Sequence, residues 1–106
     1  MEKLNREIFL SFWKVHILYH AEKEGVYGQW MIKELRRHGY DISPGTLYPI
    51  LERMEEYGWI ASDSDPGGGA KARKNYTLTQ EGKEIIKVIK EQVKELYREV
   101  VLGDES

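Results

Sequence analysis

The sequence predicts a mainly α-helical domain with a small β-hairpin, an α+β fold. Three observations lead to this prediction. Four segments carry apolar residues at helical spacing, and two short alternating segments flank a glycine-rich stretch. The last helical segment is longer than a small core requires. The length of 106 residues suits one domain, and an apolar content of 41% is sufficient to form a core.

The composition excludes several classes of protein. The chain has no cysteine, so it has no disulfides, thiolate nucleophiles or thiolate metal ligands. Charged residues begin the chain and Lys14, His16 and His20 interrupt the apolar segment after them, which argues against a secretory signal. No apolar stretch is long enough to span a membrane, and no nucleophile-elbow pattern surrounds a serine. We therefore expect a cytoplasmic protein that makes no membrane contact and is not an enzyme.

The first helix is predicted at about residues 5–24, and it is apolar on two faces. The first face carries Ile8, Phe12, Val15 and Tyr19. The second face carries Phe9, Trp13, Ile17 and Leu18. A helix with two apolar faces must bury both, and in so small a domain we expect the second face to meet another subunit.

Two further helices form a pair joined by a short turn. The earlier one covers about 28–38, and the later one covers about 43–57, with Ser43 as its N-cap. Leu47, Ile50, Leu51 and Met54 give the later helix a stripe that should face the core. The turn over residues 39–42 has the length of a helix-turn-helix connection.

A β-hairpin is predicted after the third helix. Residues 59–62 form its first strand, the glycine-rich loop covers 65–69, and residues 73–78 form the returning strand. Three helices followed by a hairpin indicate a winged helix-turn-helix, which we place at residues 1–79.

The last helix is predicted at 80–102, with Thr79 as its cap. Its apolar residues are spaced by 3, 4, 3 and 4 positions, which is the pattern of a coiled-coil seam. The residues of this seam are Ile86, Ile89, Val93, Leu96 and Val100. We assign residues 80–106 as a long C-terminal dimerisation helix with a short tail, because the seam extends beyond what one small core can cover.

Three groups of residues resemble the PadR-like family of winged-helix transcriptional regulators. Gly45-Thr46-Leu47-Tyr48-Pro49, continued to Ile60, is similar to the recognition-helix signature GTLYPxLxRLExxGLI, with Met54 and Trp59 in place of two leucines. Arg73-Lys74-x-Tyr76-x-Leu78-Thr79-x-x-Gly82 resembles the family's wing strand and last-helix entry. Gly28-x-x-Met31-x-Lys33-x-Leu35 is a third, weaker match. The resemblance spans about residues 17–82 and implies a DNA-binding regulator.

Double-stranded DNA is the partner that these residues would contact. A recognition helix enters the major groove by its N-terminus, and cations of a wing suit phosphates. The net charge of −2 counts against a nucleic-acid binder, so the contacts would come from local patches. The candidate DNA-binding residues are Ser43, Gly45, Thr46, Tyr48, Lys71, Arg73, Lys74 and Tyr76.

The short tail after the wing is similar to that of the compact members of the family, which dimerise through their first and last helices. The candidate dimer-interface residues are Phe9, Trp13, Ile86, Ile89, Val93, Leu96, Tyr97 and Val100. The resemblance also implies a small hydrophobic or aromatic effector, for which Phe9, Trp13 and Tyr97 are the candidate pocket residues. This chain has no Trp in its last helix, and the alternative role of these aromatics is plain packing.

Two other functions remain open at this point. His16 and His20 share a helix face with Glu24, which would suit a metal-dependent hydrolase. Two histidines without a confirmed third ligand are too few to predict a metal site, so we expect no metal and no cofactor. The acidic balance of the chain would suit a winged-helix protein-interaction module without DNA binding. The sequence favours a homodimeric, ligand-responsive repressor that binds an inverted-repeat operator.

Overall fold

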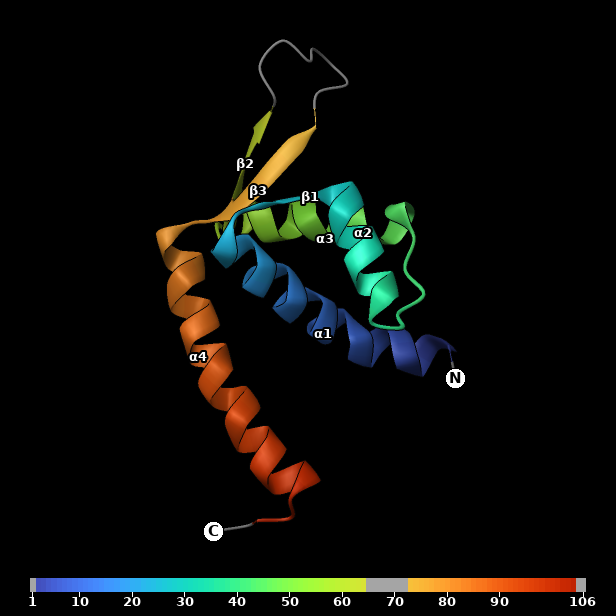
Figure 1. The fold of residues 1–106 in the computed structure, drawn as a ribbon, viewed down its shortest axis with the longest axis vertical. Coiled ribbons are helices and arrows are strands. Elements are labelled where there is room, and N and C mark those ends of the chain that lie inside the picture. Colours follow the sequence, from blue (N-terminus) through green and yellow to red (C-terminus); the bar gives the residue numbers. More distant parts are fainter. Residues whose placement is uncertain (1, 65–72, 105–106) are drawn as a thin grey trace.

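The computed structural model describes residues 2–64 and 73–104, and it confirms a mainly helical fold with a small antiparallel sheet (Figure 1). The elements are α1 (Glu2–Lys23), β1 (Val26–Tyr27), α2 (Gly28–Arg37), α3 (Pro44–Glu56), β2 (Ile60–Ser64), β3 (Lys74–Leu78), α4 (Gln80–Leu96) and the π-helical turn η2 (Tyr97–Val101). The predicted loop at 65–69 lies outside the described residues.

The sheet has three strands, in the order β1-β3-β2, where the sequence predicted a two-stranded hairpin. β2 pairs with β3 from Ile60 opposite Leu78 to Ser64 opposite Lys74. The additional strand is β1, in which Val26 pairs with Tyr76. A strand of two residues is too short to show alternation, so β1 could not be predicted from the sequence. β1 covers the edge of β3 that a hairpin would leave unpaired.

The two predicted helix caps behave differently. Thr79 is the N-cap of α4: its hydroxyl accepts the N–H of Gly82 at 3.0 Å and donates to the carbonyl of Gly58. Thr79 therefore ties the start of α4 to the end of α3. Ser43 occupies the N-cap position of α3, but its hydroxyl contacts the hydroxyl of Thr46 at 3.4 Å instead of a backbone N–H.

The core lies between α1, α2, α3 and the sheet. Its fully buried side chains are Ile17, Leu18, Met31, Leu35, Ile42, Leu47, Leu51, Met54, Ile60 and Ile86. The predicted core stripe of α3 is thus confirmed, and the stripe of α2 is buried beside it.

The face of α1 that we expected at a subunit interface packs into the core, and the other apolar face is toward solvent. Trp13 was expected at a subunit interface, but it is 4% exposed and its ring contacts Phe9 and Tyr40 in the core of its own chain. Phe12 and Tyr19, from the other face, are exposed. Helical spacing identifies two faces but cannot tell which one the rest of the chain will cover.

Helix α4 leaves the body of the molecule after its first turns. Gly82 and Ile86 are buried, whereas every residue from Lys90 to Asp104 is exposed. Figure 1 shows this helix running away from the other elements, on the opposite side from the hairpin. Its last turn widens to a π-helix at Tyr97, where an unbroken α-helix was predicted. Within residues 2–64 and 73–104, no helix combines the length and hydrophobicity required to cross a membrane.

Candidate nucleic-acid interface

Helix α3 has one face in the core and one face toward solvent. Because Leu47, Ile50 and Leu51 are buried, Tyr48 is turned outward and is 38% exposed. Ser43 and Gly45 are exposed and Thr46 is half-buried, all within the first turn of the helix or just before it. The N-terminal end of α3 therefore presents hydroxyl groups and backbone N–H groups to solvent, which is the chemistry that binds phosphate oxygens.

The ring of Tyr48 lies directly against Gly28, the first residue of α2. A Cβ atom at position 28 would lie 2.6 Å from Cε1 of Tyr48 and 2.9 Å from its hydroxyl oxygen. Only glycine leaves room for the ring in this position, because real Cβ atoms essentially never come within 3.0 Å of another atom. Gly28 therefore sets the direction in which Tyr48 points, a role that its place in the weakest sequence match did not reveal.

A notch of about 310 Å³ lies between α3 and the wing, which is the hairpin of β2 and β3. It is lined by Tyr27, Gly28, Gln29, Tyr48, Glu52, Arg73, Lys74 and Tyr76. The guanidinium of Arg73 stacks over the ring of Tyr27 at 4.7 Å, a cation–π contact that positions the cation at the notch. The structure thus brings Tyr48, Arg73 and Lys74 together at one notch. Lys71 lies outside the described residues.

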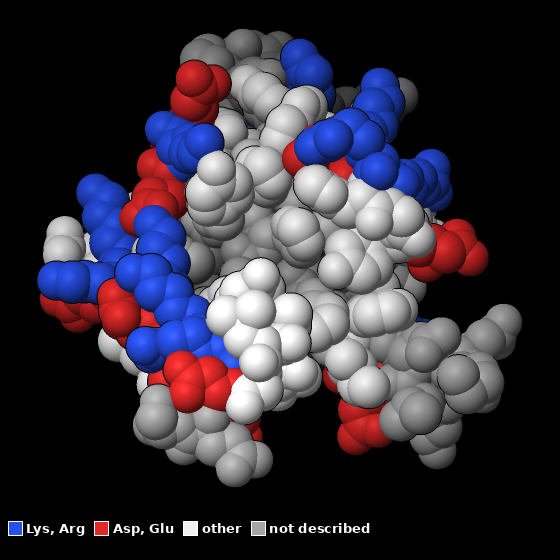
Figure 2. All heavy atoms as spheres, turned by 60° about the horizontal axis from the view of Figure 1, so that its bottom comes forward, with Lys and Arg blue, Asp and Glu red and all other residues white. Residues whose placement is uncertain are grey.

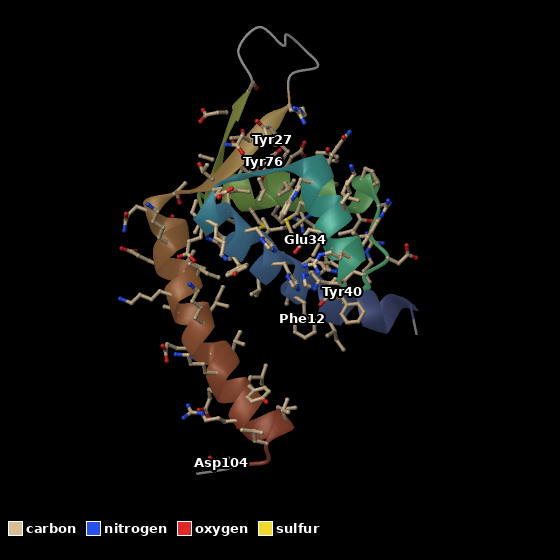
Figure 3. The ribbon with its side chains drawn as sticks, in the orientation of Figure 1. Phe12, Tyr27, Glu34, Tyr40, Tyr76 and Asp104 are labelled. Carbon is tan, nitrogen blue, oxygen red and sulfur yellow. The ribbon has the colours of Figure 1, made fainter. Side chains whose placement is uncertain are left out.

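Tyr76 does not have the exposed position that a DNA contact requires, and this corrects the expectation. It is 3% exposed, because it is the one residue of β3 whose side chain is buried in the core. Figure 3 shows it beside Tyr27, where the sheet meets the helices. Burial raises the pKa of its hydroxyl, with smaller effects from Glu55 and Tyr48. Tyr76 is therefore a neutral support at the base of the notch.

The acidic residues of α3 have separate roles. The carboxylate of Glu55 accepts the backbone N–H of Ser62 at 3.2 Å and its hydroxyl at 2.7 Å, so it joins α3 to β2. Glu52 lines the notch with Tyr48 and Lys74. Glu52 follows Tyr48 by four residues, which is one turn of α3. Its negative charge beside the two cations would disfavour phosphate at that point.

A second surface lies between α1 and α4. It is a groove of about 940 Å³, and its lining includes Phe12, Tyr19, Ile89, Val93 and Leu96. Figure 2 shows an uncharged area in the middle of this side of the molecule, with charged side chains gathered around it. Tyr97 and Val100 are also exposed, but Trp13 and Ile86 are core residues and Phe9 is half-buried. The proposed pocket residues Phe9, Trp13 and Tyr97 do not line the groove.

The comparisons with known proteins find transcriptional regulators. Residues 17–88 match the family model of the PadR-like transcriptional regulators. The chain is 41% identical to the transcriptional regulator Rv3488 of Mycobacterium tuberculosis over 98 residues, which cover 92% of this chain and 91% of the relative. These names indicate a transcriptional regulator and not an enzyme.

Solved structures show the same fold. A PadR-like transcriptional regulator from Bacillus cereus has a TM-score of 0.79 at 26% identity, covering 97% of this chain and 98% of that one. A PadR family transcriptional regulator from Eggerthella lenta has a TM-score of 0.73 at 30% identity, covering 99% of this chain and 96% of that one.

Proposed function

The chain belongs to the PadR-like family of transcriptional regulators, and we propose that it is a homodimeric repressor that binds an inverted-repeat operator. One observation carries the DNA-binding part of this proposal: exposed Tyr48 of α3 lines one notch with two cations, Arg73 just before β3 and Lys74 at its start. In such an arrangement, helix α3 would read base edges in the major groove while the wing contacts the sugar-phosphate backbone.

The dimer would form through α1 and α4. Exposed apolar residues include Phe12 (43%) on α1, Val93 (50%) and Leu96 (57%) on α4 and Val100 (69%) in η2, and a second copy of the chain would remove them from water. Residues 1–79 would then bind DNA and residues 80–106 would join the subunits. The two recognition helices should lie about 34–36 Å apart, in successive major grooves.

The first experiment is selection of sheared genomic DNA by the purified protein, followed by sequencing of the retained fragments. We expect enrichment of an inverted repeat whose half-sites lie about one helical turn apart. If no sequence is enriched and retention does not depend on salt, the protein does not read DNA. A winged-helix protein-interaction module would then be the better description, in keeping with the net charge of −2.

Two substitutions separate base contacts from phosphate contacts on the selected operator. Tyr48→Ala should weaken operator binding more than binding to a shuffled sequence. Lys74→Ala should weaken binding to the operator and to the shuffled sequence. Because each dimer has two wings, the slope of log K against log salt should become shallower by about 1.8. Lys83→Ala, a lysine on α4 that lines neither the notch nor the groove, is the matched control. Unchanged affinity in both notch variants would refute this docking mode.

The dimer interface has its own matched pair of variants. Leu96 and Val88 are both exposed apolar residues of α4, but only Leu96 lines the groove. We expect Leu96→Glu to give monomers and Val88→Glu to leave the dimer intact, as measured by light scattering after size exclusion. A mass of two chains for Leu96→Glu would show that α4 does not join the subunits.

The effector that we propose is a small hydrophobic or aromatic molecule that binds in the groove. This groove is mainly apolar and includes the rings of Phe12, Tyr19 and Tyr40. Binding there should alter the spacing of the subunits, and linkage then requires that effector and operator weaken each other's binding equally. Titration with the fluorescent probe anilinonaphthalene sulfonate, with and without operator, measures this coupling. A probe affinity that the operator does not alter would refute it.

A further inference from the structure

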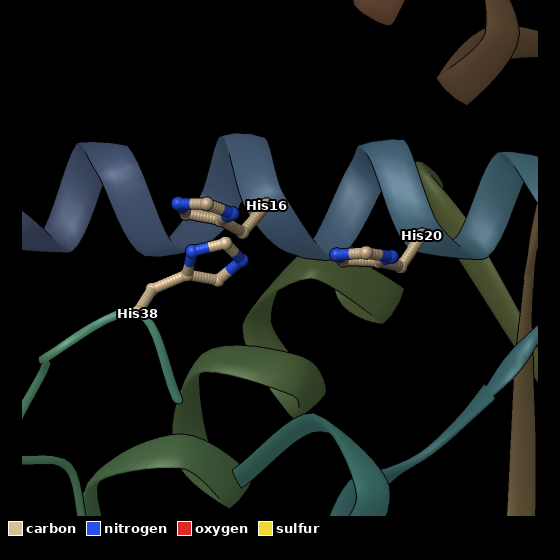
Figure 4. Close-up of side chains that lie close together, drawn as sticks. All are labelled: His16, His20 and His38. Atoms are coloured by element: carbon tan, nitrogen blue, oxygen red, sulfur yellow. The ribbon is translucent and has the colours of Figure 1, made fainter. Parts of the chain in front are cut away.

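All three histidines of the chain come together in one cluster. The chain contains only His16, His20 and His38, and the structure places one ring nitrogen of each within 4.8 Å of the other two. Figure 4 shows two of the rings on α1 and the third at the end of α2. A cluster that gathers every histidine of a cysteine-free chain is the one place in it where several nitrogen ligands are available to an ion.

Local structure explains why these side chains meet. His16 and His20 are four residues apart on α1, so they share one face. Their rings are nearly parallel, with centroids 6.5 Å apart. His38 is the C-cap of α2, and its ring lies 4.9 Å from that of His16. The third histidine therefore comes from another helix. The sequence offered Glu24 as a third ligand, but Glu24 is not part of the cluster.

A carboxylate lies beside the cluster. Oε2 of Glu34 is 3.4 Å from Nε2 of His20 and 3.1 Å from Nε2 of His38. Arg37 donates two hydrogen bonds of 2.9 Å to the same carboxylate, and it is the main reason why the pKa of Glu34 is lowered to about 2. Glu34 is therefore ionised. It can orient the two imidazoles by accepting their N–H groups, as carboxylates beside metal-bound histidines do.

Metal binding also depends on the form of the three rings and on their freedom to move. Neutral imidazole is the form that donates a lone pair to a metal ion. Metal–nitrogen bonds of about 2.0–2.1 Å require the three nitrogens to move inward, and His38 can do so because its side chain is 37% exposed at a helix end.

We propose that His16, His20 and His38 form a binding site for one divalent transition metal ion of the Zn²⁺ type, with Glu34 as the positioning carboxylate. Imidazole ligands suit Zn²⁺ and the neighbouring ions Co²⁺ and Ni²⁺, and they do not suit Mg²⁺ or Ca²⁺. The three histidines and Glu34 all line the groove, so the ion would connect α1 to the end of α2 at one wall of it. This inference does not depend on the DNA-binding proposal.

The test is titration of the full chain, freed of metal by a chelator, with Zn²⁺ in a calorimeter. We expect one ion per chain, and loss of at least about tenfold in affinity for each of His16→Gln, His20→Gln and His38→Gln. Glu34→Gln should weaken binding by about 10–100-fold through ring orientation. Glu24→Gln is the matched control and should bind as the wild type does. Co²⁺ should give the visible absorption of a low-symmetry nitrogen site, retained in Glu34→Gln and lost in His38→Gln.

Thermal unfolding provides a second readout. Zn²⁺ should raise the unfolding midpoint of the wild type and of Glu24→Gln, but not that of His38→Gln. His38 is the least buried of the three, so its variant should fold even if the other two do not. Absence of Zn²⁺ binding to the wild type, or equal binding by His38→Gln, would overturn the proposal. Binding of Mg²⁺ as tight as that of Zn²⁺ would overturn the assigned metal class.

Discussion

Replacement of Gly28 by Ala should damage DNA binding while the protein stays folded. The new Cβ atom would lie 2.6 Å from the ring of Tyr48, so the ring must move by roughly 0.8 Å to reach an ordinary contact of 3.4 Å. The atoms in the way are at the far end of one side chain, which can rotate. Alanine also favours the folded state at a helical position by about 0.4–1 kcal/mol. We therefore expect stability to be unchanged or slightly higher.

The expected loss of operator affinity follows from the displacement of Tyr48. A shift of this size is sufficient to break one hydrogen bond per half-site, at about 1 kcal/mol each. The two half-sites of a dimer together lose about 2 kcal/mol, which corresponds to roughly a thirtyfold increase in Kd. Fluorescence anisotropy with the selected operator measures this value. A shuffled duplex should show a much smaller change, because phosphate contacts of the wing remain.

A double-mutant cycle decides whether the effect acts through Tyr48. In a Tyr48→Ala background the ring is absent, so Gly28→Ala should have no further effect on operator binding. Trp30→Ala, which truncates an exposed residue of α2 outside the notch, is the control for unspecific changes at this end of α2. The reasoning is wrong if Gly28→Ala retains wild-type operator affinity. It is also wrong if Gly28→Ala lowers operator affinity as much in the Tyr48→Ala background as in the wild type.

Three further predictions concern stability. Thr79→Ala removes the acceptor for Gly82 N–H and should lower the free energy of unfolding by about 1–2 kcal/mol, whereas Thr79→Ser should not; urea titration compares them. Gly82→Ala should prevent stable folding, because its Cβ would overlap the carbonyl oxygen of Trp59, and circular dichroism would show lost helix. For metal-free protein, the urea midpoint of unfolding should fall as the pH drops below 6.5. Burial lowers the pKa of His16 and His20 in the folded state. The unfolded chain therefore binds more protons than the folded chain at low pH, which favours unfolding. A midpoint for His16→Gln with the full wild-type pH dependence would contradict this.

The sequence determined the elements that depend on neighbouring residues. The stripe of Leu47, Ile50 and Leu51 has helical spacing and a proline at its start, so the recognition helix and its buried face could be predicted. The cap at Thr79 is equally local, because a hydroxyl meets a backbone N–H three residues later. The notch residues Tyr48, Arg73 and Lys74 were predicted as a set because the resemblance to a family supplied their common role.

Only the tertiary structure decided what depends on contacts between distant segments. Periodicity shows that α1 has two apolar faces, but the position of Tyr40 and of the rest of the core places Trp13 inside and Phe12 outside. Alternation cannot tell which face of β3 is covered, so Tyr76 was expected at the surface and is buried. The histidine cluster needs the turn after α2 to bring His38 to α1. In each case the deciding contact joins residues from different elements, and no local pattern in the chain records it.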